Sequence, residues 1–185
     1  PERLLERIAD EIVEALHPTH VAVFLADEPW PGLAARREEA RVAWAPEGAD
    51  GDAPGYLLLV HREVLEDGER GEESRSRPDD VTLFSRTPIS RLLSESAAGE
   101  AEVLDVFPAS GSPARSAPPA PGDGLRLLSD RDLFELFDAR LVLPLATEGK
   151  ALGFVVLGQK RSDEHYTHRD RALLLPVAEQ ASIAL

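Results

Sequence analysis

ARLVLPLATEGKALGFVVLG, residues 139–158, is the segment that best reveals the fold. Two apolar runs, 139–146 and 151–158, flank a short polar connector, and both are rich in branched residues that favour strands. Gly149 suits a turn that needs a positive φ, so the two runs predict an antiparallel hairpin. Gly153, inside the second run, indicates a close approach of another backbone. The segment therefore predicts two neighbouring, buried strands.

A polar segment and then a helix follow this hairpin. Thr167 and Asp170 have the three-residue spacing of a capping box, with Asp in place of the usual Glu or Gln. The residues that follow, RALLLPVAEQASIAL (171–185), predict the body of the helix. Pro176 lies in its interior, where proline removes one backbone hydrogen bond and crowds the preceding turn. We interpret Pro176 either as a tolerated residue or as a hinge.

Four segments carry a resemblance to a known family: LVLPL (141–145), GKALGFVVLG (149–158), YTHRDRALL (166–174) and AEQASIAL (178–185). Their order resembles the C-terminal half of a GAF domain, a small-molecule-sensing module of bacterial signalling proteins. The resemblance is close over these segments and loose over the rest of the chain. It implies a fold but no particular ligand, because GAF domains bind very different molecules.

The preceding residues supply the remaining elements of such a fold. Apolar residues recur at three- and four-residue spacing between Leu4 and Leu16, which predicts an amphipathic helix that ends near Pro18. Further strands are expected at 21–25, 41–44, 56–61 and 102–107, with the second and third of these paired. Shorter helices are expected from Thr87 to Gly99 and after Ser129.

The order of these elements predicts an α+β fold like that of the GAF family. We expect an antiparallel sheet of five to six strands, with the N- and C-terminal helices packed on one face and shorter helices in the connections. Residues 1–185 form a single domain in this interpretation. Two long polar excursions, 62–80 and 108–124, interrupt it where family members carry pocket-lining segments, and both are predicted to be flexible.

The composition excludes several classes of function. With 34 acidic and 20 basic residues the net charge is −14, which disfavours binding to nucleic acid or to an anionic membrane surface. No apolar run is long enough to span a bilayer and no signal peptide is recognisable, so we expect a cytoplasmic protein. The chain has no cysteine, which excludes thiolate catalysis, thiolate metal sites, and the family branches that attach bilins or reduce sulfoxides through cysteine.

The sequence contains no recognisable catalytic or metal-binding motif. The histidines are His17, His20, His61, His165 and His168. No pair of them has the spacing of a helical metal site, and we assign no metal ligand, no catalytic residue and no cofactor. His61 is open to two interpretations: a solvent-facing residue at a strand end, or a haem ligand of the kind found in a minority of GAF domains. The N-K-F-D-E motif of the cyclic-nucleotide branch has no match, so a cyclic-nucleotide site is not expected.

The resemblance implies that a ligand pocket, if present, lies between the sheet and the middle segment of the chain. The candidate apolar lining residues are Trp44, Leu58, Val60, Leu92, Val103, Leu133, Phe137 and Leu143. Each of them is also explained by a place in the core. Asp105 and Arg140 are the polar candidates, and a surface ion pair explains either residue equally well.

Apolar stripes on the two terminal helices motivate a homodimer. The residues expected at its interface are Leu5, Ile8, Ile12, Leu174, Ala178 and Ala181. We expect the chain to be part of a longer bacterial signalling protein, for which the resemblance suggests a sensor histidine kinase of a two-component system, a PP2C-type phosphatase or a cyclic-di-nucleotide enzyme. Binding would change how the terminal helices pack across the dimer and so reach the output domain of that protein.

The sequence therefore favours a non-catalytic sensory or regulatory GAF domain that binds a small ligand or a partner. The alternative is a degenerate GAF domain that binds no small molecule and acts as a dimerisation spacer, which the polar excursions and the lack of a ligand motif support. A stand-alone enzyme on this fold is the third reading, and the absence of cysteine argues against its best-known form.

Overall fold

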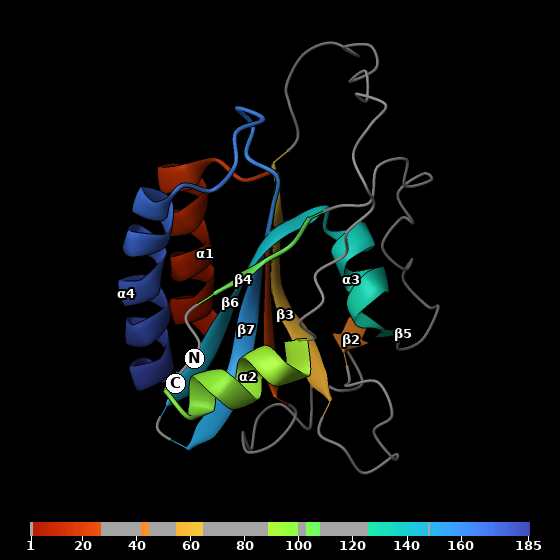
Figure 1. The fold of residues 1–185 in the computed structure, drawn as a ribbon, viewed down its shortest axis with the longest axis vertical. Coiled ribbons are helices and arrows are strands. Elements are labelled where there is room, and N and C mark those ends of the chain that lie inside the picture. Colours follow the sequence, from red (N-terminus) through yellow and green to blue (C-terminus); the bar gives the residue numbers. More distant parts are fainter. Residues whose placement is uncertain are drawn as a thin grey trace.

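The computed structural model describes residues 2–26, 42–44, 55–64, 89–99, 103–107, 126–147 and 149–185. A central sheet has two helices, α1 and α4, on one face, and α2 and α3 lie on the other side (Figure 1). The helices are α1 (Glu2–Leu16), α2 (Ile89–Ala97), α3 (Asp130–Leu136) and α4 (His168–Ala184). This arrangement confirms the predicted α+β class and the shared side of the terminal helices.

The described strands form one seven-stranded sheet in the order β4-β6-β7-β1-β3-β2-β5. They are β1 (His20–Ala26), β2 (Val42–Trp44), β3 (Tyr56–Glu63), β4 (Leu104–Asp105), β5 (Arg126–Leu128), β6 (Ala139–Thr147) and β7 (Lys150–Gly158). Six neighbouring strands pair antiparallel, as predicted, and β6 and β7 form the predicted hairpin. The sequence does not predict β5, a short seventh strand that pairs parallel to β2 at the edge.

Two strands depart from their predicted ranges by two residues at an end. β3 continues to Glu63, into a segment predicted to be loop, because its last residues pair with the start of β1. β4 covers only Leu104–Asp105, since only these two residues pair with β6. The rest of the predicted excursions, 65–80 and 108–124, lies outside the described residues, as does the expected helix cap at Thr87.

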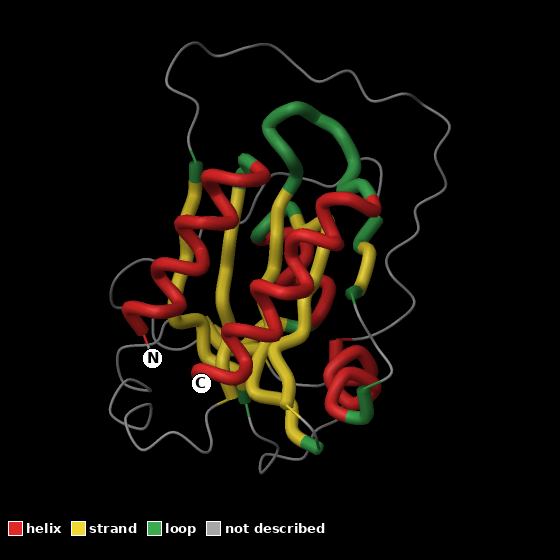
Figure 2. Tube along the Cα trace, turned by 90° about the vertical axis from the view of Figure 1, so that its left-hand side faces the viewer, coloured by secondary structure: helices red, strands yellow, loops and turns green. Residues whose placement is uncertain are grey.

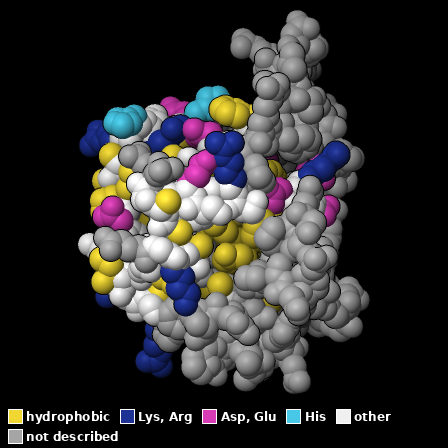
Figure 3. All heavy atoms as spheres, turned by 60° about the horizontal axis from the view of Figure 1, so that its bottom comes forward, with side chains coloured by type: hydrophobic (Ala, Val, Ile, Leu, Met, Phe, Trp, Pro, Cys, Tyr) yellow, Lys and Arg dark blue, Asp and Glu magenta, His cyan; other side chains and the backbone are white. Residues whose placement is uncertain are grey.

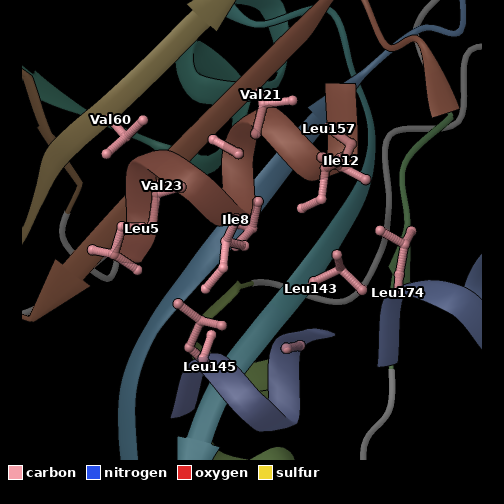
Figure 4. Close-up of a cluster of buried hydrophobic side chains, with 14 of the residues drawn as sticks. Leu5, Ile8, Ile12, Val21, Val23, Val60, Leu143, Leu145, Leu157 and Leu174 are labelled. Carbon is pink, nitrogen blue, oxygen red and sulfur yellow. The ribbon is translucent and has the colours of Figure 1, made fainter. Parts of the chain in front are cut away.

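The core beneath α1 and α4 fixes the position of both terminal helices (Figure 4). Leu5, Ile8 and Ile12 of α1 and Leu174 of α4 are buried against the sheet. The strand residues that meet them include Val21, Val23, Val60, Leu143, Leu145 and Leu157. Burying a side chain of this size stabilises a fold by roughly 2 kcal/mol, so this layer accounts for a large part of the stability.

The opposite face of the sheet carries an aromatic core. Phe24 and Phe154 stack with their ring centroids 4.8 Å apart, and Trp44 meets Phe154 edge-on at 5.4 Å. All three side chains are fully buried. Apolar residues of α2 and α3 complete this layer: Ile89, Leu92, Leu93, Leu133, Phe134 and Leu136. The aromatic core therefore joins the short helices to the sheet.

The local signals at the hairpin and at α4 are confirmed. Gly149 has a φ of 78°, and a Cβ on Gly153 would lie 2.1 Å from the carbonyl oxygen of Phe24. Thr167 and Asp170 form a capping box in which each side chain bonds to the other residue's backbone. Figure 2 shows α1 and α4 lying together on their face of the sheet, with the start of α1 near the end of α4. The segment that leads into α4 lies at the opposite end of the molecule.

Candidate functional site

The predicted pocket residues are divided between the two faces of the sheet. The residues in or against the aromatic core are Trp44, Leu58, Leu92, Leu133 and Phe137. Those in or against the core beneath α1 and α4 are Val60, Val103 and Leu143. The structure therefore brings the first five together and separates them from the other three. Leu58 and Val60 are two positions apart on β3 and would share a face of a regular strand, but the register of β3 against β1 shifts between them, which places them on opposite faces.

The two polar candidates, Asp105 and Arg140, line one cleft at the end of the sheet. The cleft has a volume of about 220 Å³ and lies between the end of β4, the start of β6 and the segment 159–166 that leads to α4. Arg171, from the first turn of α4, forms part of its wall. Acidic, basic and histidine side chains lie next to one another along the upper edge of Figure 3, at the end of the molecule where segment 159–166 lies.

Ion pairs hold the polar side chains of this cleft. Arg171 Nη2 lies 2.7 Å from Asp105 Oδ1, and Arg140 Nη1 lies 2.9 Å from Asp138 Oδ1. Arg140 Nη2 also donates to Gln159 Oε1 at 3.0 Å. The four charged side chains are between 20% and 35% exposed, so each pair contributes no more than about 1 kcal/mol to the free energy of unfolding. These ion pairs hold the two arginine side chains in position, but each pair is weak enough for another charged group to replace one of its members.

Arg171, a residue that lines the cleft, has one buried donor without a partner among the described residues. Arg171 Nε is enclosed, and no described residue accepts a hydrogen bond from it. A buried donor without an acceptor costs about 1–3 kcal/mol, so the Arg171 guanidinium is not fully satisfied in this arrangement. The same guanidinium donates from Nη2 to the carbonyl oxygen of Tyr166 at 3.5 Å, which keeps it against the cleft. Arg171 is a functional candidate that the sequence analysis did not identify.

Segment 159–161 bonds to the ends of both terminal helices. The amide of Arg161 donates to the carbonyl of His17, directly after α1, at 3.0 Å. Lys160 Nζ lies 2.6 Å from Asp170 Oδ2 in the first turn of α4, and both side chains are nearly buried. Burial by itself would raise the pKa of Asp170, but the bonds from Lys160 and Thr167 outweigh it and lower that pKa. The Asp170 side chain is therefore bound to Lys160 and Thr167 in its ionised form.

Tyr166 attaches the same segment to the end of β7. Its hydroxyl donates to the carbonyl oxygen of Gly158 at 2.8 Å, and its ring is buried. Burial, followed by the negative charge of Asp170, raises the pKa of Tyr166 far above its usual value. The phenol therefore remains a hydrogen-bond donor at any physiological pH, and it ties the start of α4 to the end of β7.

His20 and His61 form a pair on the aromatic side of the sheet. Their rings are stacked with centroids 5.6 Å apart, and His20 Nδ1 lies 3.3 Å from His61 Nε2. His61 also meets Phe137 edge-on at 5.2 Å. Burial lowers the pKa of His61, and the neighbouring His20 lowers it further. His61 is thus half-buried between two rings instead of facing solvent, and haem ligation by it stays a prediction.

Asp130 is a positioning residue that the sequence analysis recognised only as part of a helix start. Its Oδ1 accepts a hydrogen bond from Trp44 Nε1 at 2.6 Å, and its Oδ2 accepts one from the amide of Ile89 at 2.8 Å. One carboxylate therefore links β2, α2 and α3. Its two partners lie 86 and 41 positions away along the chain, so no local pattern identifies them.

The six residues expected at a dimer interface lie inside the chain's own core. All of them, from Leu5 to Ala181, belong to the layer between the sheet and helices α1 and α4. Exposed apolar residues occur instead on the outer side of α4, where Leu173 is 54% exposed and Ile183 is 82% exposed. The dimer remains a prediction, and its contacts would have to come from outward residues such as these.

The described part of the chain has neither a cluster of metal ligands nor a helix that could span a membrane. No three histidine, aspartate or glutamate side chains there are grouped as metal ligands. His17, His165 and His168 are exposed. None of the described helices is long and apolar enough to cross a membrane.

Comparison with known proteins agrees with this architecture. The sequence profile of the GAF domain matches residues 1–185. Neither the curated proteins nor the solved structures gave a match to the chain. The profile covers the whole chain, and the sheet with both terminal helices on one face agrees with the GAF fold. The protein therefore belongs to the GAF domain family.

Proposed function

We propose that this GAF domain is a non-catalytic sensory or regulatory module that binds a small ligand or a partner and relays binding through its terminal helices. Membership of the GAF family supports a sensory or regulatory role. The parent would be a cytoplasmic bacterial signalling protein, such as a histidine kinase of a two-component system or a PP2C-type phosphatase. Its output domain would receive the signal from α1 and α4.

The bonding of segment 159–161 to both terminal helices is the observation that carries this proposal. Gln159 lines the cleft, Arg161 bonds to the end of α1, and Lys160 pairs with Asp170 at the start of α4. A molecule that moves this segment therefore acts on both helices at once. It shifts their packing only if it binds one arrangement more tightly than the other.

A homodimer through the outer side of α4 fits the same mechanism. Leu173, Pro176, Gln180 and Ile183 are exposed and recur at three- and four-residue spacing along one side of the helix. Such a stripe suits contact with the same helix of a second chain. Movement at the start of α4 would then change the relation between the two subunits.

The second candidate function is a dimerisation spacer without a small-molecule ligand. The packing of the aromatic core favours it, because Phe24, Trp44 and Phe154 are fully buried against one another on the face where the family resemblance places a pocket. A spacer would form its dimer through the same outer side of α4 but would bind no ligand in the cleft.

Native mass spectrometry of the protein as purified from its expression host, with an absorption spectrum of the same sample, tests these proposals. We expect extra mass that is lost on denaturation. A visible band would indicate a bound ligand that absorbs light or haem, and His61 is the candidate residue for a haem. A dimer with the mass of two chains and no bound ligand would instead favour the spacer. A monomer of bare mass at all concentrations would contradict both.

A further inference from the structure

We propose that the cleft at the start of α4 binds a small zwitterion of the amino-acid class, with its carboxylate held by Arg140 and Arg171. Such a molecule would be the signal of the proposed sensor, so the assignment rests on that function. The cleft lies at the edge of the sheet, whereas the family resemblance places a pocket over the aromatic core. It contains the two polar residues predicted for the pocket, Asp105 and Arg140, but none of the predicted apolar lining residues.

The charges of the cleft favour a ligand that carries both signs. The wall contains two guanidinium groups, from Arg140 and Arg171, and three carboxylates, from Asp105, Asp163 and Glu164. A simple anion would face all three carboxylates, and a simple cation would face both guanidinium groups. A zwitterion can direct its carboxylate to the arginines and its ammonium group to the carboxylates, which satisfies both sets.

The two arginines have hydrogen-bonding capacity for a carboxylate. The Arg171 side chain is 32% exposed, although its Nε atom is itself enclosed and not open to the cleft. Its pair with Asp105 and the Arg140 pair with Asp138 are each partly exposed, so a ligand can replace either partner at little cost. A carboxylate has two oxygens that match the edge of a guanidinium, and a bidentate contact of this kind is the strongest that arginine makes.

The size and apolar wall of the cleft limit the ligand further. A volume of about 220 Å³ is below the range of roughly 300–1,000 Å³ typical of pockets for drug-sized molecules. Nucleotides and tetrapyrroles are therefore too large for this cleft. Val106 and Phe107 form an apolar part of the wall, and Phe107 is 56% exposed, so a short apolar side chain has a surface to contact. Alanine, serine and valine have the required size and charge.

NMR titration of the ¹⁵N-labelled chain tests the assignment. The probes are L-alanine, L-serine and L-valine at millimolar concentration, with propionate as the matched anion and ethylamine as the matched cation. We expect one of the amino acids to shift the amide signals of residues 105–107 and 159–166, and to bind more tightly than either control. Because the wild-type protein supplies this result, it does not depend on the folding of any variant.

Three substitutions sharpen the test. Arg140→Gln should weaken amino-acid binding about tenfold or more, because a charge-assisted contact is lost. Asp105→Asn should weaken amino-acid binding and strengthen propionate binding, because one repelling carboxylate is removed. Arg91→Gln, an exposed arginine on α2 with an ion pair to Glu95, serves as the matched control and should leave binding unchanged.

Several outcomes would overturn the assignment. Propionate binding as tightly as the amino acids would make this an anion site, and the absence of shifts with every probe would remove the site. Extra mass in native mass spectrometry that Arg140→Gln retains would place the ligand elsewhere, with the sensor function intact. Shifts confined to the cleft, with none in α1 or the body of α4, would uphold the site and contradict the relay.

Discussion

At the residue scale, Gly153 is the position where the packing of two strands leaves no room for a side chain. A Cβ would lie 2.1 Å from the Phe24 carbonyl oxygen, and this oxygen belongs to the backbone of β1 and cannot rotate away. We predict that Gly153→Ala lowers the free energy of unfolding by about 3 kcal/mol. Urea denaturation of the two proteins measures the difference.

Two other glycines provide controls for that experiment. Gly55→Ala places its Cβ 3.8 Å from the nearest atom, an ordinary contact, and should change stability by less than about 0.5 kcal/mol. Gly149→Ala meets no atom within 4 Å but has a φ of 78°, so it should cost about 1 kcal/mol from backbone strain alone. A Gly153→Ala protein as stable as Gly55→Ala would contradict the close approach of β7 to β1.

His61 makes the stability of the domain depend on pH. Because burial and His20 lower its pKa from the usual 6.5, the folded protein prefers the neutral ring while the unfolded chain takes up a proton below that pH. Glu63 acts in the opposite direction, and Arg62 acts with His20. The free energy of unfolding should therefore be constant above about pH 7 and fall as the pH is lowered to about 5.5.

Chemical denaturation at a series of pH values measures this dependence. His61→Gln should flatten it between about pH 7 and pH 5.5, because the half-buried ring has been removed. His168→Gln, a change at an exposed histidine in the first turn of α4, is the matched control and should retain the wild-type slope. A slope that survives in His61→Gln would assign the effect to another group.

At the element scale, Asp170 stabilises the start of α4 in two ways. It completes the capping box with Thr167, and it pairs with the nearly buried Lys160. Asp170→Ala removes both and leaves Lys160 without its partner, so we predict a loss of about 3 kcal/mol in the free energy of unfolding. Urea denaturation measures it.

Helix α3 provides the comparison for Asp170, since Ser129 and Asp132 form a capping box of the same kind. Asp132→Ala removes a box without a buried ion pair and should cost about 1 kcal/mol. The difference between the two losses isolates the contribution of Lys160. Equal losses would show that the Lys160 pair contributes nothing to the attachment of α4.

Pro176 lies within α4, which nevertheless runs from His168 to Ala184 without interruption. The residue is exposed, so water can bond to the backbone carbonyl that proline leaves without a partner. Pro176→Ala should raise the free energy of unfolding by about 2 kcal/mol, because alanine restores the helical hydrogen bond. A loss of stability, measured by urea denaturation, would contradict simple tolerance, and an unchanged helix path and ligand response in Pro176→Ala would contradict the hinge interpretation.

At the scale of the whole molecule, the outer side of α4 is the surface expected to join two subunits. Leu173→Glu combined with Ile183→Glu places charge on this surface without entering the core, and should convert a dimer into a monomer in sedimentation equilibrium. Arg91→Glu, on α2, changes the net charge by the same amount and should leave the dimer intact. A double variant that remains dimeric would place the interface elsewhere.

Features that depend on short-range interactions were predictable from the sequence, whereas contacts between distant segments were not. The hairpin, the positive φ of Gly149 and the capping box at Thr167 depend on residues within a few positions, and all three were predicted. The parallel pairing of β5 with β2 joins segments more than eighty positions apart and was missed. The same holds for Asp130, whose partners are Trp44 and Ile89.

The sequence by itself determined the family, the α+β class, the hairpin and the start of α4, because periodicity, turn residues and caps act locally along the chain. Only the tertiary structure decided which candidate residues share a face of the sheet, and that Asp105, Arg140 and Arg171 meet in one cleft. The physical reason is that strand register and the path of the chain place side chains from β4, β6 and α4 together. Those distances in space are not encoded in the spacing of residues along the sequence.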